Sequence, residues 1–324
     1  MYTLTEAQKL IEKHLENIKF PEEPADLYDP VRYILSTGGK RIRPALVLLS
    51  CDMFAGSVDS ALHPATAIEI FHNFTLLHDD IMDRSEIRRG RETVHVKWNE
   101  NVAILSGDAM SILASSFMNE APGAVLRNVH NVFTRTAIQV CEGQQLDMNY
   151  EKVLMVEEKE YLRMIELKTA VLIAASLKIG AMLGGSSETD AVHLYDFGRD
   201  LGLAFQLQDD LLDAYGDPEI FGKKPGMDIV DNKKTILMIT ALKAAGPEQS
   251  EALKKWLTAS DFDPEEKVDA VIRIFDALHV KEKVERMINS YYQAALENLK
   301  KLNTPAERKT ELFAFAESLM ERKK

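Results

Sequence analysis

Apolar residues recur at helical spacing along almost the whole of the 324-residue chain. Two clear runs are Leu10, Ile11, Leu15 and Ile18, and Val284, Met287, Ile288, Tyr291, Tyr292 and Ala295. A period near 3.6 residues predicts amphipathic helices, whereas the alternating pattern that is typical of strands is scarce. The chain is therefore expected to be all-α.

Gly, Pro, Asp and Ser residues mark the ends of the predicted helices. The breaks are FPEEPADLYDP, LSTGGKRIRP, LGGSSETD, YGDPEIFGKKPGMDIVDNKK, AAGPEQ and DFDPEE. No connecting segment is long or simple enough to mark a domain boundary, so we expect one helical domain over residues 1–324. The segment TAVLIAASLKIGAMLGG at 169–185 is apolar nearly all round, which predicts a place at the centre of a large bundle.

Composition narrows the class of protein further. A net charge of −12 argues against a nucleic-acid partner, because the phosphates would meet a repulsive field. The two cysteines, Cys51 and Cys141, are too few for a disulfide framework and are expected to be small core residues in a reducing compartment. No run approaches the roughly 20 apolar residues of a bilayer span, and the N-terminus has the pattern of an amphipathic helix, so a cytoplasmic protein is expected.

One acidic pattern occurs twice, in LLHDDIMD at residues 76–83 and in QLQDDLLD at 206–213. Within each cluster the first and last aspartates are four residues apart and share a helix face, while the middle one lies about 100° round. A single motif of this kind is more often a solvated polar face. Here each cluster follows an apolar stretch, AIEIFHNFTLL or LGLAFQLQ, and carboxylates gathered at the end of a buried stripe are ligands that suit Mg²⁺.

Basic residues that suit a phosphate or diphosphate accompany the clusters. The segment GGKRIRP places Lys40, Arg41 and Arg43 in a Gly-rich turn before a helix expected to begin near Pro44, where backbone N–H groups also favour anions. It lacks the GxxxxGK pattern of a nucleotide P-loop. Further basic residues follow the two clusters, at Arg88, Arg89, Lys223, Lys224, Lys233 and Lys234. One such pair alone is more often a surface feature, but this placement favours a metal-bound diphosphate.

Taken together, these segments resemble the trans-isoprenyl diphosphate synthases, also called the polyprenyl synthetase family. The segments GGKRIRP, HNFTLLHDDIMDRSEIRRG, EGQQLD, ELKTA, FQLQDDLLD and GKKPGMDIVDNKKT occur in the order and spacing of that family. The resemblance implies an isoprenoid synthase fold, which is an all-α bundle around a central apolar cavity, and a homodimer. It also implies Mg²⁺ dependence, with three ions per active site, and head-to-tail condensation of isopentenyl diphosphate with an allylic diphosphate.

By position, the resemblance implies a role for individual residues. The metals would be held against the allylic diphosphate, directly or through water, by Asp79, Asp80, Asp83, Asp209, Asp210 and Asp213. That diphosphate would be neutralised by Arg88, Lys168, Lys223 and Lys233. Isopentenyl diphosphate would be bound by Lys40, Arg43, His72 and Arg89. Thr169 and Gln206 match positions near the reacting carbons, where neutral oxygens can stabilise a cation without being alkylated.

Product length is expected to depend on the helix before the first cluster. Counting back from Asp79, the fifth and eighth residues are Phe74 and Phe71, about 7.5 Å and about 12 Å of helix rise below it. In the resembled family a bulky fifth residue commonly forms a floor that stops chain growth. Thr75, at the fourth position, is not aromatic, and the cluster lacks a two-residue insertion seen in some bacterial short-chain enzymes. We expect a C15 or C20 product, with C20 slightly favoured; the other interpretation is that both Phe residues are ordinary core.

Other functions stay open at this point. A terpene cyclase would share the fold and the first acidic motif, but such enzymes usually change the second motif and need no isopentenyl site. The remaining alternatives are a longer-chain synthase, a catalytically silent subunit of a heteromeric synthase and an acidic helical interaction protein. The basic C-terminus, Arg322, Lys323 and Lys324, is either a flap over the diphosphate or a frayed tail.

Overall fold

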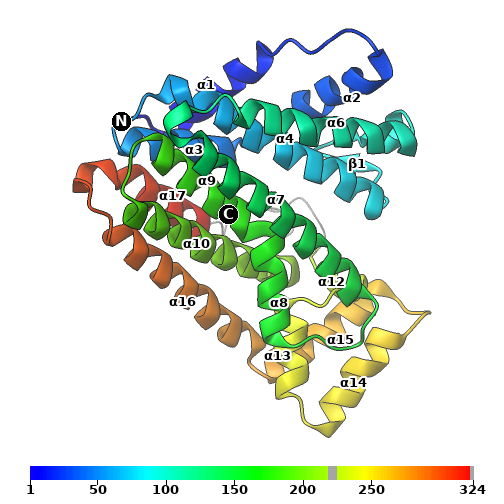
Figure 1. The fold of residues 1–324 in the computed structure, drawn as a ribbon. Coiled ribbons are helices and arrows are strands. Elements are labelled where there is room, and N and C mark those ends of the chain that lie inside the picture. Colours follow the sequence, from blue (N-terminus) through cyan, green and yellow to red (C-terminus); the bar gives the residue numbers. More distant parts are fainter. Residues whose placement is uncertain (218–224, 322–324) are drawn as a thin grey trace. The chain divides into compact units, whose positions relative to one another are not determined.

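The structure, a computed structural model, describes residues 1–217 and 225–321. The chain is all-α, as the helical spacing predicted (Figure 1). Contacts group it into two compact units, each drawn from separate stretches of sequence. Unit 1 comprises Met1–Ala137, Ala175–Tyr195 and Leu302–Glu311, and unit 2 comprises Ile138–Ala174, Asp196–Lys301 and Leu312–Lys324. A single domain over residues 1–324 and a central cavity stay predictions.

Unit 1 is built mainly from the N-terminal helices. They are α1 (Leu4–Glu16), α2 (Ala25–Ser36), α3 (Ile42–Met53), α4 (Val58–Met82), α5 (Val94–Lys97) and α6 (Glu100–Met118), with the hairpin β1 (Ile87–Arg88) and β2 (Arg91–Glu92). The first part of α7 (Gly123–Glu151), parts of α9 (Val171–Leu183) and α10 (Glu188–Tyr215), and the 3-10 turn η2 (Ala306–Arg308) complete it.

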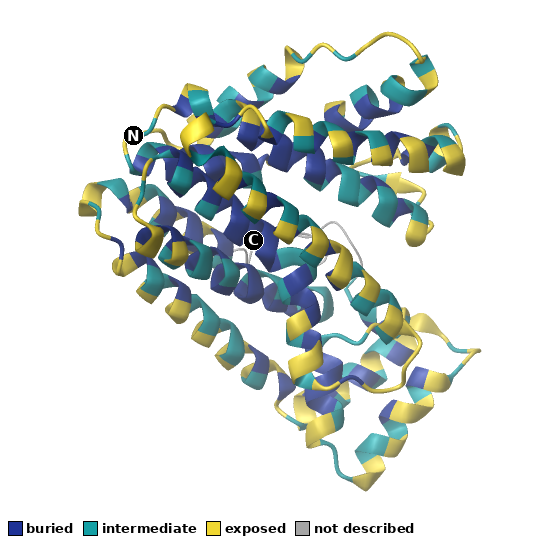
Figure 2. Ribbon diagram, viewed as in Figure 1, coloured by how far each residue is buried: buried dark blue, intermediate teal, exposed yellow. Residues whose placement is uncertain are grey.

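The core of unit 1 forms around α3 and α4. In α3 every residue from Pro44 to Cys51 is buried, and α4 is buried without a break from Pro64 to Phe71. The helix α6 packs along α4, and Gly107 allows the close approach, because a Cβ atom there would lie 2.2 Å from His78 Nε2. The expected burial of 169–185 is confirmed within α9, which is buried along most of its length (Figure 2).

Unit 2 contains the rest of α7, α9 and α10 together with the C-terminal helices. These are α8 (Glu158–Ile165), the π-helical turn η1 (Glu166–Ala170), α12 (Met227–Val230), α13 (Ile236–Ala244), α14 (Pro247–Thr258), α15 (Pro264–Ala277), α16 (Val280–Lys300) and α17 (Thr310–Met320). Apolar residues of α8, α10, α13, α15 and α16 form one hydrophobic core. The amphipathic run predicted in α16 is confirmed, because Val284 and Ala295 are buried.

Two local expectations were wrong, and one element was missed. Part of the break FPEEPADLYDP is helical, since α2 begins at Ala25 and contains Pro30; the missing N–H of one proline is offset by burying that residue with Val31 and Ile34. The short hairpin after the first acidic cluster was not predicted. Cys51 is buried as expected, but Cys141 is exposed, because it lies on the outward face of α7.

One helix in the described part of the chain, α6, is long and apolar enough in composition to cross a membrane. A single helix of this kind is weak evidence for a span. Packing accounts for part of this composition, because Ala103, Met110 and Ala114 of α6 are buried.

The approach of α9 to α3 within unit 1 requires a glycine at position 180. A Cβ atom there would lie 2.2 Å from the carbonyl oxygen of Val47. We expect Gly180→Ala to lower the free energy of unfolding by about 1–3 kcal/mol or more, the usual cost of overpacking. The measurement is denaturant unfolding against Gly123→Ala as control, because a Cβ at Gly123 meets nothing within 4 Å. Equal stability of the two variants would contradict the requirement.

Candidate active site

The first acidic cluster lies at the C-terminal end of α4, in unit 1. Asp79 and Asp80 occupy its last turn, and Asp83 is the exposed C-cap residue. Asp80 is 2% exposed, and its Oδ1 accepts a hydrogen bond from Arg88 Nε at 2.7 Å. Burial raises the pKa of Asp80, and the charge of Arg88 opposes this effect. Arg88 also lies 3.8 Å from Asp79, so one guanidinium serves two carboxylates.

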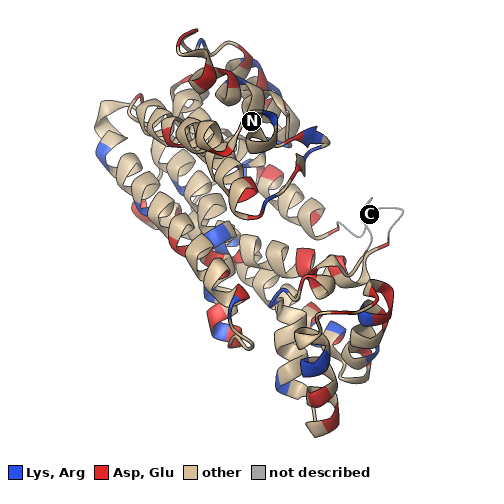
Figure 3. Cartoon of the chain, turned by 90° about the vertical axis from the view of Figure 1, so that its right-hand side faces the viewer, with Lys and Arg blue, Asp and Glu red and all other residues tan. Residues whose placement is uncertain are grey.

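A tight hairpin carries this arginine and the next one. The two residues between the paired Arg88 and Arg91 are Arg89 and Gly90, with φ values of 53° and 74°. Two central residues with positive φ are the signature of a type I′ turn. The arginines give the arrows of the hairpin their blue colour in Figure 3. The hairpin therefore presents Arg88 and Arg89 as a fixed pair.

Arg89 contacts the glycine turn that the sequence marked as an anion site. Its Nη1 donates a hydrogen bond to the carbonyl oxygen of Gly38. At Gly39, where φ is 140°, a Cβ atom would come within 2.9 Å of the same guanidinium. Both glycines are therefore required, one for its backbone conformation and the other also for the close approach of Arg89.

Two of the predicted isopentenyl diphosphate ligands contact each other. Arg43 Nη1 lies 3.2 Å from His72 Nε2. An arginine can only donate, so Nε2 of His72 is the acceptor and the imidazole is neutral. Burial, together with the charges of Arg43, Arg89 and Arg88, holds the pKa of His72 well below its usual value.

The residues predicted to control product length lie in an aromatic group on α4 and its neighbours. Phe71 is buried, and its ring centroid lies 5.5 Å from those of both Phe74 and Phe133. Phe74 is half-buried and lies 4.8 Å from the ring of His78. Thr75 donates through Oγ1 to the carbonyl oxygen of His72 at 2.8 Å. The aromatic wall below the first acidic cluster therefore has several members, of which sequence analysis named two.

The second acidic cluster lies near the end of α10, in unit 2. Asp209 and Asp213 are partly buried, whereas Asp210 is 5% exposed. The carboxylate of Asp213 accepts from the backbone N–H of Asp228 at 3.0 Å, in the first turn of α12. This bond ties the segment around Asp228 to α10.

Asp210 is surrounded by donors from three other positions. Its Oδ2 accepts from the hydroxyl of Tyr161 and from the backbone N–H of Ile236 at 3.2 Å, and its Oδ1 accepts from Gln206 Nε2 at 3.4 Å. Burial raises the pKa of Asp210 to about 7, although these hydrogen bonds work in the opposite direction. Gln206 in turn accepts from Thr169 Oγ1 at 3.2 Å, so Thr169, Gln206, Asp210 and Tyr161 form one hydrogen-bonded chain.

The π-helical turn η1 carries the motif ELKTA, and therefore Lys168 and Thr169. Such turns are frequent at functional sites because they redirect side chains. Glycine in a neighbouring helix makes room for it: a Cβ at Gly143 would lie 2.3 Å from the backbone nitrogen of Lys168. Lys168 Nζ pairs with Asp147 Oδ2 at 2.6 Å, and both Gly143 and Asp147 belong to the segment EGQQLD.

Among the other predicted lysines, Lys233 forms an ion pair. Lys233 Nζ lies 2.7 Å from Asp228 Oδ1. Burial would lower the pKa of Lys233, but the hydrogen bond and charge of Asp228 outweigh it and raise that pKa. The predicted residues that lie outside the described part of the chain are Lys223, Lys224 and the basic C-terminus, Arg322, Lys323 and Lys324.

Most of the predicted site residues thus form hydrogen bonds or ion pairs within the protein. Some of the partner residues were not predicted from the sequence. The missed partners are Glu69, Asp147, Tyr161 and Asp228. Glu69 had a signal, as the one charged residue in the apolar run 64–71, and Asp147 ends a motif quoted for the resemblance. Within residues 1–217 and 225–321, no three acidic, His or Cys side chains are grouped so that they could hold a metal ion.

The chain is similar to proteins of known family. A family model described as Polyprenyl synthetase matches residues 24–275. A geranylgeranyl diphosphate synthase of Methanosarcina mazei is 38% identical over 301 residues, which cover 92% of this chain and 90% of that protein. A short chain isoprenyl diphosphate synthase of Methanothermobacter thermautotrophicus is 39% identical over 300 residues, or 92% and 91% of the two chains. A crystal structure of a geranylgeranyl pyrophosphate synthase matches with a TM-score of 0.94 and 43% identity, covering 100% of both chains.

The all-α fold and these matches define a trans-prenyltransferase of isoprenoid biosynthesis. The chain belongs to the polyprenyl synthetase family, as its ordered motifs predicted.

The neutral state of His72 has a consequence for stability. In the unfolded chain His72 gains a proton as the pH falls through 6.5, whereas in the folded chain it stays neutral. The unfolded state then binds more protons, so folding loses stability below pH 6.5, by at most about 1.4 kcal/mol per pH unit for one group.

We expect His72→Gln, which keeps an acceptor for Arg43, to remove this part of the pH dependence. Urea unfolding of both proteins at pH 7.5 and pH 5.5 measures it. A variant that loses as much stability as the parent between these two values would show that His72 is not held neutral.

Proposed function

We propose that this protein condenses isopentenyl diphosphate head-to-tail with an allylic diphosphate, dimethylallyl, geranyl or farnesyl, and releases diphosphate. The product is an all-trans prenyl diphosphate of short chain, with C20 slightly favoured over C15. Membership of the polyprenyl synthetase family carries the proposal. It is supported by the contact of Arg88 with the first acidic cluster, by the charge of Asp213 in the second cluster acting on Lys233, and by the paired neutral oxygens of Thr169 and Gln206.

The donor chemistry of the clusters fits Mg²⁺. The ion binds through one or two carboxylates together with water and phosphate oxygens, so it needs no complete protein cage. Asp83 is exposed and the side chain of Asp79 is 20% exposed, which leaves carboxylate oxygens accessible. The ligands we propose, direct or through water, for three ions are Asp79, Asp80, Asp83, Asp209, Asp210 and Asp213. When bound, Mg²⁺ supplies positive charge that stabilises the departing diphosphate.

Within this set, Asp80 and Asp210 differ from the others because they are buried, being 2% and 5% exposed. Arg88 donates to Asp80, while Tyr161 and Ile236 donate to Asp210. We assign these two to contacts through water and to fixing their neighbours. Cleavage of the allylic carbon–oxygen bond places negative charge on the diphosphate, which Arg88, Lys168, Lys223 and Lys233 are proposed to neutralise.

Carbon–carbon bond formation then needs an orienting site and a protected cation. Lys40, Arg43, His72 and Arg89 are proposed to bind the diphosphate of isopentenyl diphosphate, so that its double bond faces the allylic cation. Thr169 and Gln206 offer neutral oxygens to that cation. The new bond forms between the two substrates, and the proton lost from isopentenyl diphosphate goes to the released diphosphate. Water has to be excluded, since it would convert the cation to an alcohol.

A product assay tests the proposal. The purified protein is incubated with Mg²⁺, isopentenyl diphosphate and, separately, each of the three allylic diphosphates, and the dephosphorylated alcohols are sized by chromatography. We expect a C20 alcohol, and no product when EDTA removes the divalent ions. A longer alcohol would mean a longer-chain synthase, cyclic hydrocarbons would mean a terpene cyclase, and no turnover with any starter would favour a silent subunit of a heteromeric synthase.

The aromatic group in α4 supports the short product. Phe74 is less buried than Phe71, and both rings belong to one wall with Phe133. We propose that Phe74 forms the floor that ends chain growth, with Phe71 behind it and Thr75 beside it.

Phe74→Ala is expected to lengthen the product by one or more five-carbon units, because it removes the ring that forms the proposed floor. Phe117→Ala is the matched control, since Phe117 is also a partly buried ring of unit 1 but stacks on His63 instead. The alcohols of both variants are sized as above. A folded Phe74→Ala protein with an unchanged product would remove Phe74 from the floor.

We also propose a cytoplasmic homodimer. The outward side of α6 carries Ile104, Leu105 and Ile112, which are 43%, 60% and 71% exposed. Exposed apolar side chains on one helix favour a protein partner, and a second copy of the chain is the partner that the family resemblance implies.

A further inference from the structure

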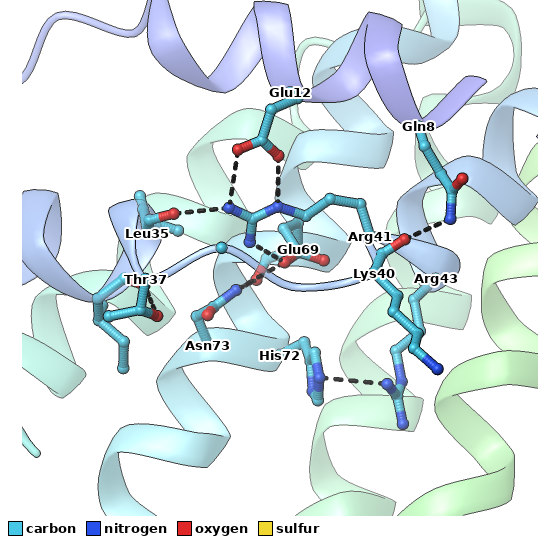
Figure 4. A network of polar contacts seen from close by, with 12 residues as sticks. Gln8, Glu12, Leu35, Thr37, Lys40, Arg41, Arg43, Glu69, His72 and Asn73 are labelled. Carbon is cyan, nitrogen blue, oxygen red and sulfur yellow. Dashed lines mark hydrogen bonds and ion pairs between the residues drawn. The ribbon is translucent and has the colours of Figure 1, made fainter. Parts of the chain in front are cut away.

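Arg41, the middle basic residue of GGKRIRP, points into unit 1 and is 4% exposed (Figure 4). Its Nη1 lies 2.6 Å from Glu69 Oε1, its Nε lies 2.7 Å from Glu12 Oε2, and its Nη2 donates to the carbonyl oxygen of Leu35 at 2.6 Å. One guanidinium therefore joins α1, α2 and α4. Neighbouring Lys40 and Arg43 belong to the proposed diphosphate site, but Arg41 faces the protein.

These contacts determine the path of the turn. Arg41 has a φ of 46° and is the N-cap residue of α3, so its side chain and the start of that helix are fixed together. The carbonyl oxygen of Lys40 accepts from Gln8 Nε2 at 2.5 Å, which gives α1 a second hold on the turn (Figure 4). The backbone that carries Lys40 and Arg43 is thus anchored by Gln8, Glu12 and Glu69.

Glu69 is buried in the otherwise apolar part of α4, where it is 2% exposed. Besides Arg41, it accepts from Asn73 Nδ2 at 2.9 Å. Burial lowers the pKa of Arg43 and of Arg89, and the charge of Glu69 opposes this lowering. This carboxylate therefore balances several guanidinium groups of the proposed site.

We propose that Glu12, Arg41 and Glu69 are positioning residues for the isopentenyl diphosphate site: their ion-pair network holds the 38–43 turn so that Lys40 and Arg43 converge on the diphosphate. The inference rests on the proposed function. It assigns Arg41 to the support of the site and gives an anionic residue a part in binding an anion.

The sign of one effect separates positioning from simple electrostatics. Neutralising a carboxylate near an anion site makes the site more positive, which by charge alone tightens diphosphate binding. If the carboxylate instead holds the turn, its loss lets Lys40 and Arg43 move and binding weakens, since small displacements of positioned groups are costly. The two explanations therefore predict opposite changes in KM for isopentenyl diphosphate.

The test compares Glu12→Gln, Glu69→Gln and the control Glu16→Gln, which removes the same charge from an exposed position of α1. For each variant, KM is measured for both substrates, and isopentenyl diphosphate alone is titrated calorimetrically. We expect KM and Kd for isopentenyl diphosphate to rise about threefold in Glu12→Gln and about tenfold in Glu69→Gln, with KM for the allylic substrate within about twofold of the parent. Glu16→Gln should match the parent.

Glu12→Gln decides the question even if Glu69→Gln does not fold, because the Glu12 side chain is 43% exposed and tolerates the change. A fall in KM for isopentenyl diphosphate, no change, or an equal rise for both substrates would overturn the positioning role. Failure of the proposed function looks different, because the parent protein would then neither bind isopentenyl diphosphate nor turn it over.

Discussion

A charge at the end of an apolar helix has to meet a donor or acceptor when it is buried, and this constraint organises both parts of the candidate site. In unit 1 it pairs Asp80 with Arg88 and Arg41 with Glu69. In unit 2 it surrounds Asp210 with Tyr161 and a backbone N–H group. Each pairing fixes a segment that carries further predicted site residues, so these charged residues also constrain the local backbone.

The arrangement also depends on glycines, because these closely packed groups fit only where a neighbouring residue has no side chain. Gly39 leaves room for the guanidinium of Arg89, and Gly143 leaves room for the π-helical turn that presents Lys168 and Thr169. In both places the glycine belongs to a motif whose charged members are more conspicuous. The motif is thus a unit of packing as well as of chemistry, because its polar residues reach their positions only if its small residues are kept.

The fold class and the family could be predicted before the structure, whereas the roles of single residues stay predictions. Helical spacing predicted the all-α fold, and the motif order predicted the family, both of which are confirmed. The errors were local: α2 continues through Pro30, and Cys141 is exposed. The structural preference of a single proline or cysteine is weak compared with tertiary packing. Packing decides where a helix begins and which of its faces is buried.

The sequence by itself determined the class of the protein, because the period of its apolar residues, its composition and its motif spacing can be read directly from the chain. Only the tertiary structure decided which partner each charged side chain of a motif meets inside the protein. Arg41 and Arg43 stand two positions apart in one motif, yet Arg41 is held by Glu12 and Glu69 while Arg43 contacts His72. The side-chain partners that set these two directions, Glu12, Glu69 and His72, lie 28 or 29 residues away in the chain, and no local pattern encodes such contacts.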